Sequence, residues 1–229
     1  YVLINMSLRD ITDVSSRLFL PDVIKLDNYK SALAGSDLWH GFRNSLVLAL
    51  ETVVIEISIG SIGAYGLARL KNRYSASFRT LNMMVMMIPG TALLVGTYSL
   101  MNNLGLSNSL IGLALLSAGG GLPGTVFFYT NFVAAIPAAL DEAAEIDGAS
   151  VLRTFVQIIF PQLKAITVTR IIMIFIGSWN DYLMPMYLLS SNEKQTIILV
   201  IKQAFSSSNG TGNLPLAAAT CALGLLPII

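Results

Sequence analysis

Four consecutive aromatic and polar residues in an otherwise apolar stretch have the chemistry of a binding site. They are Trp179, Asn180, Asp181 and Tyr182. An aromatic face beside an amide and a carboxylate suits sugar hydroxyls, because the ring stacks and the oxygens accept hydrogen bonds. A carboxylate inside a membrane costs about 2.5–3.5 kcal/mol unless it faces a cavity or a partner. The tetrad therefore either lines a solute path or hydrogen-bonds neighbouring helices at a subunit interface.

Two glutamates stand in a second apolar stretch, residues 44–68. Glu56 is its middle residue, and the offset in sequence turns Glu51 about 140° around a helix. We expect Glu56 to line a path through the membrane or to pair with a basic group of a partner subunit. The alternative is a protonated carboxyl group that is hydrogen-bonded inside a helix bundle. No role is predicted for Glu51.

The composition excludes several classes of protein. The chain has 229 residues, of which 54% are hydrophobic and 12% charged, against roughly 25% charged in soluble domains. It is therefore an integral membrane protein rather than a soluble enzyme or a disordered chain. A net charge of +1 provides no phosphate-binding field for a nucleic acid. One cysteine, Cys221, and one histidine, His40, predict no internal disulfide and no histidine-based metal site.

The apolar runs are continuous, which favours membrane-spanning helices over the alternating pattern of a β-barrel. A span needs about 20 apolar residues. The predicted spans are residues 44–68, 81–101, 110–132 and 165–189, with a fifth beginning near Pro215. We expect residues 1–43 to be an external segment that follows a missing first helix, and residues 44–229 to form the transmembrane domain, in a chain truncated at both ends.

Small residues and prolines mark points where these spans pack or bend. Gly60, Ala64 and Ala68 form a stripe that lets another helix approach closely. The glycines at 119–121, followed by Pro123-Gly124, are expected to interrupt or distort the third span. Pro89-Gly90 is interpreted in the same way in the second span, and either break serves packing or lines a cavity.

The placement of basic residues predicts the orientation in the membrane. Loops on one side hold seven of them, and the positive-inside rule makes loops 69–79 and 133–164 cytoplasmic. The seven are Arg69, Lys71, Arg73, Arg79, Arg153, Lys164 and Arg170. The opposite loops, 102–109 and 190–214, hold only Lys194 and Lys202.

Residues 137–161 predict a helical hairpin on the cytoplasmic side. Pro137 suits a first helical turn, and Gly148 stands where a residue with positive φ ends a helix. Ser150 can cap a second helix, which must end near Phe160 because Pro161 disfavours helical dihedrals before it. A hairpin of this length has no core of its own and needs a partner surface.

This hairpin resembles the EAA signature of permease subunits of bacterial ATP-binding-cassette (ABC) importers. The matching residues are Glu142, Ala143, Ala144, Gly148, Ile158 and Pro161, and Phe160 departs from the usual leucine. The resemblance implies that the hairpin docks on an ATPase subunit and transmits its closure. The hairpin also carries four acids, namely Asp141, Glu142, Glu145 and Asp147. We interpret this acidic cluster as part of the docking surface rather than as a merely solvated face.

Further segments resemble the carbohydrate-importer group, in particular the second maltose-type permease subunit. They are Leu26-Asp27-Asn28-Tyr29, Phe42-Arg43-Asn44-Ser45-Leu46, Ala64-Tyr65-Gly66-Leu67-Ala68-Arg69, Ile88-Pro89, Leu104-Gly105-Leu106-Ser107-Asn108 and Trp179-Asn180-Asp181-Tyr182. Together with the glutamate singled out above, the candidates for the translocation path are Trp179, Asn180, Asp181, Tyr182, Glu56 and Asn44.

The resemblance implies an all-α, polytopic membrane protein with the six-helix type I permease fold, in the bacterial cytoplasmic (inner) membrane. The implied partners are a second permease subunit, two ATPase subunits that bind ATP and Mg, a solute-binding protein outside, and the lipid bilayer. No Gly-x-x-x-x-Gly-Lys-Ser/Thr loop is present, so no cofactor and no catalytic residue are expected in this chain. The alternatives are a self-contained secondary transporter, a permease for a non-sugar solute, and, last, a membrane-embedded hydrolase.

Overall fold

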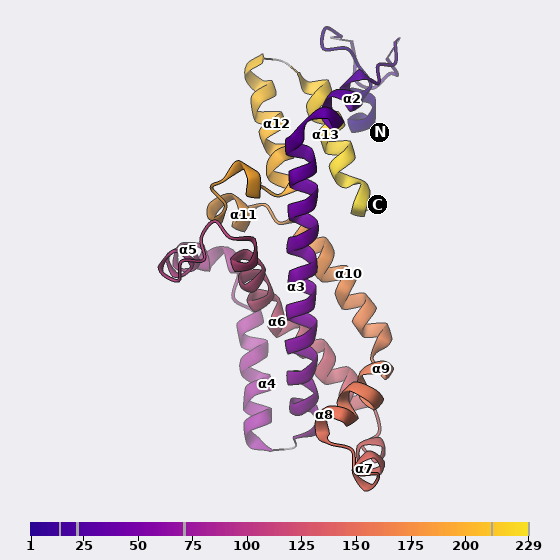
Figure 1. Ribbon diagram of the computed structural model, residues 1–229, viewed down its shortest axis with the longest axis vertical. Helices are drawn as coiled ribbons and strands as arrows, with labels where there is room; N and C mark the ends of the chain where they lie inside the picture. The colour runs from indigo at the N-terminus through magenta and orange to yellow at the C-terminus, as the bar shows by residue number, and fades with distance from the viewer. Residues whose placement is uncertain (14, 22, 71, 212, 229) are drawn as a thin grey trace.

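The computed structural model describes residues 1–13, 15–21, 23–70, 72–211 and 213–228. Its regular elements within these ranges are helices, arranged along one long helix that forms the spine of an elongated molecule (Figure 1). In chain order they are α1 Val2–Ser7, α2 Asp27–Ala34, α3 Ser36–Arg69, α4 Arg73–Met86, η1 Gly90–Leu93, α5 Leu94–Asn103, α6 Leu110–Ala135, α7 Ala139–Ile146, α8 Val151–Thr154, η2 Phe155–Ile159, α9 Phe160–Gln162, α10 Lys164–Asn180, α11 Leu183–Leu188, η3 Asn192–Lys194, α12 Ile197–Thr211, α13 Leu214–Leu225 and η4 Leu226–Ile228.

The first and third predicted spans are confirmed as α3 and α6. Both are long and apolar enough to cross a membrane, over Asp37–Arg69 and Leu110–Ala135. They pack closely where a Cβ added at Gly60 would lie 3.1 Å from Cβ of Thr125. Ala64, one turn further along α3, is fully buried. The small-residue stripe therefore serves helix packing within this chain.

The second span is broken rather than continuous. α4 ends at Met86, and the segment Gly90–Asn103 leaves it at an angle of 86°. Pro89 is the physical cause, because it lacks an N–H group and disfavours a helical conformation in the residue before it. The break places η1 beside α6 and α10, where it lines the groove described below.

The third span, for which an interruption or a distortion was predicted, is not interrupted. α6 runs unbroken from Leu110 to Ala135 with Pro123 inside it. A proline removes only one backbone donor, and membrane helices tolerate it where a neighbouring helix supplies polar groups. The carbonyl that loses its helical partner is that of Gly119, four residues earlier. Asn82 of α4 bonds to α6 close by, since its Nδ2 donates to the carbonyl of Pro123 at 2.8 Å.

The fourth span is shorter than predicted, and the loop after it contains a helix. α10 ends at Asn180 because Asp181 has an extended backbone, and α11 follows as a separate element. Residues 190–214 were expected to be a loop, but α12 occupies most of them and packs on α13 and α3. The apolar run at 197–201 explains this helix. α13 begins at Leu214, beside Pro215, as predicted.

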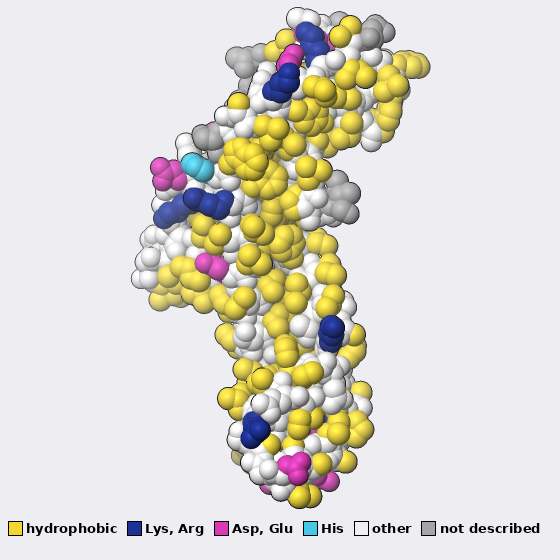
Figure 2. Space-filling model, turned by 45° about the vertical axis from the view of Figure 1, so that its right-hand side comes forward, with side chains coloured by type: hydrophobic (Ala, Val, Ile, Leu, Met, Phe, Trp, Pro, Cys, Tyr) yellow, Lys and Arg dark blue, Asp and Glu magenta, His cyan; other side chains and the backbone are white. Residues whose placement is uncertain are grey.

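Three buried clusters hold the bundle together along its length. One joins α3, α6 and the hairpin around Tyr65, Tyr129 and Ile159. A second surrounds Leu48 and Leu113, and a third surrounds Trp179 and Ile197. Outside these clusters many large apolar side chains are exposed, and in Figure 2 hydrophobic groups cover the middle of the visible face. That surface is suited to lipid or to another membrane subunit.

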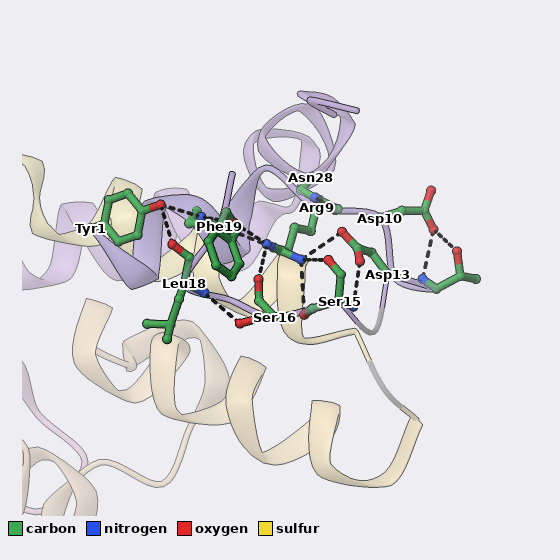
Figure 3. A network of polar contacts seen from close by, with 11 residues as sticks. Tyr1, Arg9, Asp10, Asp13, Ser15, Ser16, Leu18, Phe19 and Asn28 are labelled. Atoms are coloured by element: carbon green, nitrogen blue, oxygen red, sulfur yellow. Dashed lines mark hydrogen bonds and ion pairs between the residues drawn. The ribbon is translucent and has the colours of Figure 1, made fainter. Parts of the chain in front are cut away.

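The N-terminal segment is folded around a buried arginine (Figure 3). Arg9 is 2% exposed; its Nε donates to Asn5 Oδ1 at 2.8 Å, and its Nη2 donates to the carbonyls of Ser16 and Phe19 at 2.8 and 2.6 Å. Hydrogen bonds from Ser15 lower the pKa of Asp13. α3 begins at Ser36, earlier than the predicted span, so the segment before the spine is shorter than 43 residues.

Candidate functional site

A groove of about 600 Å³ lies between α3, α6, α10 and the broken second span. Apolar residues from η1, α6 and α10 form much of its wall, with Leu93, Leu116 and Met173 among them. Polar groups are interspersed along it. They are Thr52, Glu56, Thr97, Ser117, Arg170, Ser178 and Asp181. The groove thus combines apolar walls with a few hydrogen-bonding groups, which is typical of sites for small molecules.

The innermost polar feature of the groove is a buried ion pair between two helices. Arg170 Nη2 of α10 lies 2.5 Å from Glu56 Oε1 of α3, and these side chains are 9% and 3% exposed. Thr125 of α6 completes the cluster: its hydroxyl donates to Glu56 Oε1 and accepts from Arg170 Nε at 3.1 Å. The phenyl ring of Phe128 covers the guanidinium at 5.5 Å. Three helices are therefore joined at one charged point.

Glycine at position 121 makes the approach of Glu56 possible. A Cβ added there would collide with the Glu56 carboxyl group, whose Oε2 is the nearest atom. A Cβ at the neighbouring Gly119 or Gly120 would meet no atom of the described residues within 4 Å. Within the glycine run that was expected to interrupt or distort α6, Gly121 leaves space for the carboxylate.

The predicted partner of Glu56 is corrected by this geometry. A basic group of a partner subunit was one expectation, yet the residue that pairs with Glu56 is Arg170 of the same chain. Arg170 itself was counted among the cytoplasmic loop charges, and it is instead 7% exposed inside α10. Its position six residues beyond Lys164, within an apolar run, is the signal that distinguishes a buried arginine from a loop charge.

Asp181 lies in the same groove, where α10 ends. Its backbone is extended, and its Oδ1 accepts from the backbone N–H of Met184 at 3.4 Å, at the first turn of α11. The adjacent Tyr182 is half-buried, with the ammonium group of Lys202 5.6 Å from its ring centroid. Of the six path candidates, Glu56 and Asp181 line the groove.

The other candidates have structural contacts elsewhere. Trp179 is 1% exposed, stacks on Phe175 with ring centroids 5.5 Å apart, and donates to the carbonyl of Gly224 at 3.2 Å. Asn180 is exposed and donates to the carbonyl of Ile176 in its own helix. Asn44 is buried, and its amide donates to the carbonyls of Glu193 and Gln195 at 2.7 and 2.9 Å. It therefore holds η3 and the residue after it against α3.

Glu51 has a different environment from Glu56. Its Oε2 is buried and has no hydrogen-bond partner among the residues that the structure describes. Within the same ranges, no group of three or more His, Cys, Asp or Glu side chains is placed to hold a metal ion.

The predicted hairpin forms the end of the molecule opposite α12 and α13 (Figure 1). Gly148 has φ +76°, and the Ser150 hydroxyl caps α8 by accepting from the N–H of Arg153. The second helical segment runs through α8, η2 and α9 to Gln162, where it meets α10 at 80°. The turn chemistry predicted for this hairpin is confirmed, and its second helix ends two residues beyond Phe160.

The EAA residues divide between the surface and the interior. Glu142, Ala143, Asp147, Gly148 and Pro161 are exposed, whereas Ala144 is 3% exposed and Ile158 packs against the cluster around Tyr65. Three apolar side chains surround the turn and are strongly exposed, namely Ile146 at 87%, Val151 at 74% and Leu152 at 61%. Lys71, one of the predicted loop charges, lies outside the described residues.

Comparisons with known proteins agree with one another. A family model described as "binding-protein-dependent transport system inner membrane component" matches residues 56–229. The melibiose/raffinose/stachyose import permease protein MelC of Bacillus subtilis (strain 168) is 31% identical, over 100% of this chain and 83% of that protein. The probable starch degradation products transport system permease protein AmyC of Thermoanaerobacterium thermosulfurigenes is 32% identical, over 100% and 82%. A chain from the crystal structure of a bacterial ABC transporter for import of the acidic polysaccharide alginate matches with a TM-score of 0.86 at 21% identity, over 99% of this chain and 85% of that one.

Proposed function

Because the chain belongs to the family of inner membrane components of binding-protein-dependent transport systems, we propose that it is the permease subunit of an ATP-driven importer for a sugar or oligosaccharide. The family match confirms the resemblance to ABC importer permeases that the hairpin residues indicated. It also agrees with the all-α fold and with a place in the membrane. The relatives named above are permeases for sugars, which supports the substrate class.

The structural observation that best supports the proposal is the groove inside the helical bundle. Asp181 supplies a carboxylate at the end of α10, and the Glu56–Arg170 pair supplies donors and acceptors further in. A sugar presents many hydroxyl groups, each of which donates and accepts hydrogen bonds. A groove with both kinds of group on apolar walls suits such a solute.

The partners follow from the same proposal. The exposed turn of the hairpin, with its acids and three apolar side chains, docks on an ATPase subunit, and two such subunits bind ATP and Mg. A second permease subunit covers apolar surface of this bundle, and a solute-binding protein delivers the sugar at the end of the molecule that carries α12 and α13. Loops 69–79 and 133–164 then face the cytoplasm, in accordance with the positive-inside rule.

Reconstitution of the full transporter in proteoliposomes tests the proposal. Uptake of labelled melibiose, raffinose, stachyose, maltotriose and maltotetraose is measured with and without ATP inside the vesicles. We expect ATP-dependent uptake of at least one of these sugars when the ATPase and binding-protein subunits are present. Uptake by this chain alone would instead indicate a secondary transporter, and ATP-dependent uptake of a non-sugar solute alone would overturn the substrate class.

Substitutions of residues that line the groove then test whether the sugar passes along it. Asp181→Asn removes a charged acceptor, and a hydrogen bond to a charged group contributes about 1.5–3 kcal/mol, so half-saturation should shift to about tenfold higher sugar concentration. Glu193→Gln is the matched control, because that acid is exposed on η3. Unchanged uptake by Asp181→Asn would show that the sugar does not use this carboxylate.

A further inference from the structure

One acid of the hairpin is turned inward, toward the end of the spine helix. Tyr65 of α3 donates its hydroxyl to Asp141 Oδ1 at 2.5 Å, and Arg69 Nη2 lies 2.7 Å from Asp141 Oδ2. The Asp141 and Arg69 side chains are each 20% exposed. The acids that follow on the same hairpin, Glu142, Glu145 and Asp147, are exposed. Asp141 therefore contacts α3 of its own chain, unlike the other acids of this cluster.

Tyr65 and Arg69 extend this contact to both helices of the hairpin and to α6. The ring of Tyr65 packs on Phe155 of η2, with centroids 5.2 Å apart. Arg69 Nη1 donates to the carbonyls of Val133 and Ile136 at 3.2 and 3.1 Å. A cation at a helix C-terminus is favourable because it satisfies carbonyls that have no partner within the helix. The hairpin, α3 and α6 are thus tied together at one end of the bundle.

The spine helix connects this point to the groove. α3 is unbroken over 34 residues, so it spans about 50 Å. It carries Tyr65 and Arg69 at the hairpin end, and Glu56, paired with Arg170, lies about two and a half turns from Tyr65 and about three and a half from Arg69. A displacement of the hairpin that moves Asp141 therefore moves the helix that forms one wall of the groove.

From this geometry we infer that Asp141, Tyr65 and Arg69 form a clamp that makes α3 move as one body with the hairpin during transport. The inference rests on the proposed function, because it assigns to the clamp the transfer of motion from the ATPase side to the groove. Asp141 is a positioning residue, since it acts through α3. The exposed acids beside it are left to bind the ATPase.

Spin-label distances in the full transporter test the clamp directly. Cys221 is the single cysteine, so a Cys221→Ala background carries one label at Ala139→Cys on α7 and one at Ile62→Cys on α3, both exposed positions. We expect a narrow distance distribution that is the same without nucleotide and in the vanadate-trapped state. With Asp141→Asn added, the distribution should broaden and differ between the two states. A change of distance with the clamp intact, or no effect of Asp141→Asn, would overturn the inference.

Transport measurements provide the second readout. Raffinose and maltotetraose are the probes, and uptake per ATP hydrolysed should fall about tenfold in Asp141→Asn, while ATPase subunits still co-purify and basal ATP hydrolysis continues. Loss of co-purification would overturn the inference by assigning Asp141 to ATPase docking.

Different results would contradict the clamp inference and the proposed function. If the unmodified transporter takes up none of the sugars with ATP, the proposed function is wrong, and the distance measurement still decides the clamp. If the unmodified transporter takes up sugar and Asp141→Asn does so with the same uptake per ATP, the clamp alone is wrong. Tyr65→Phe, which keeps the ring on Phe155 and removes one hydrogen bond, should give an intermediate distance distribution.

Discussion

The Glu56 carboxylate and the Arg170 guanidinium lie 2.5 Å apart inside the bundle, although 114 residues separate them in the chain. Both side chains are nearly inaccessible, and Thr125 bonds to each of them. Breaking such a pair leaves a buried charge without its partner. The pair therefore joins α3 to α10 through α6, at the level of the groove.

Removal of one member of the pair should destabilise the protein strongly. Arg170→Met leaves the Glu56 carboxylate buried and unpaired, which costs about 3–5 kcal/mol when a buried pair is broken. Replacing both, as in Glu56→Leu with Arg170→Met, should cost less than the sum of the single changes. Reversible SDS titration of the purified protein in mixed micelles measures the free energies of unfolding. Additive effects of the two changes would show that the residues do not interact.

Alanine substitutions at two glycines of α6 distinguish a glycine that is required for the close approach of a side chain from one that only adds backbone flexibility. Gly121→Ala places a methyl group against the Glu56 carboxyl group, so the ion pair must shift, at a cost of about 1–3 kcal/mol. Gly119→Ala is the matched control on the same helix, because its Cβ meets nothing within 4 Å. An alanine there should stabilise the helix by about 0.5–1 kcal/mol. The same unfolding measurement applies, and equal effects at both positions would contradict the close-approach role of Gly121.

Two threonines of α6 should respond in opposite ways to loss of the hydroxyl group. Thr125→Val removes the group that bonds to both charges, and we expect a loss of about 1–3 kcal/mol. Thr130→Val should be neutral or stabilising, because the buried Thr130 hydroxyl has no hydrogen-bond partner within the described residues. A loss at Thr130 that matches the loss at Thr125 would show that a buried partner group contacts Thr130.

Local chemistry in the sequence predicted the features that depend on neighbours in the chain. The hairpin turn at Gly148, the cap at Ser150 and the span that became α3 each follow from residues within one or two turns. The break at Pro89 followed from the same kind of reasoning. These features depend on backbone conformation, which short segments determine.

Contacts between distant segments could not be predicted in this way. Whether Arg170 is a loop charge or a buried partner of Glu56 depends on how α3 and α10 pack, which a hydropathy pattern does not specify. The same limit applies to Trp179, which had the chemistry of a sugar platform but packs in a cluster with Leu38 and Ile197. Gly121 was interpreted as part of a run that interrupts or distorts the third span, because its role depends on a side chain 65 positions away in the sequence.

The arginine at the centre of the N-terminal fold should be sensitive to a conservative change. Arg9→Lys keeps the charge but loses the planar fork that reaches Asn5, Ser16 and Phe19 together. Hydrogen exchange measured by mass spectrometry should show lower protection across residues 15–19. Arg17→Lys is the control, because Arg17 is exposed. Unchanged protection in Arg9→Lys would show that the loop does not depend on the guanidinium.

The pH dependence of the same segment follows from its carboxyl groups. Hydrogen bonds, with Lys25 contributing most at Asp10 and Ser15 at Asp13, lower the pKa of each acid in the folded state. A lowered pKa stabilises the fold above the ordinary value of about 3.9, and the contribution is lost as the pH falls through the folded-state pKa. Protection of residues 15–19, corrected for intrinsic exchange, should therefore stay constant from neutral pH down to about pH 5 and decline only in stronger acid. A decline near neutral pH would show that another group controls the segment.

The turn of the hairpin requires a residue that tolerates a left-handed backbone, because Gly148 has φ +76°. Alanine in this left-handed conformation costs roughly 1–2 kcal/mol, whereas asparagine adopts it more readily. Gly148→Ala should therefore displace α8 relative to α7 and reduce co-purification of ATPase subunits with the full transporter, and Gly148→Asn should retain more of it. A Cβ at this position meets no neighbour within 4 Å among the described residues, so steric conflict with them does not explain a difference between the two. If alanine and asparagine reduced ATPase binding equally, the added side chain would be obstructing the ATPase surface itself, and the backbone conformation would not be the cause.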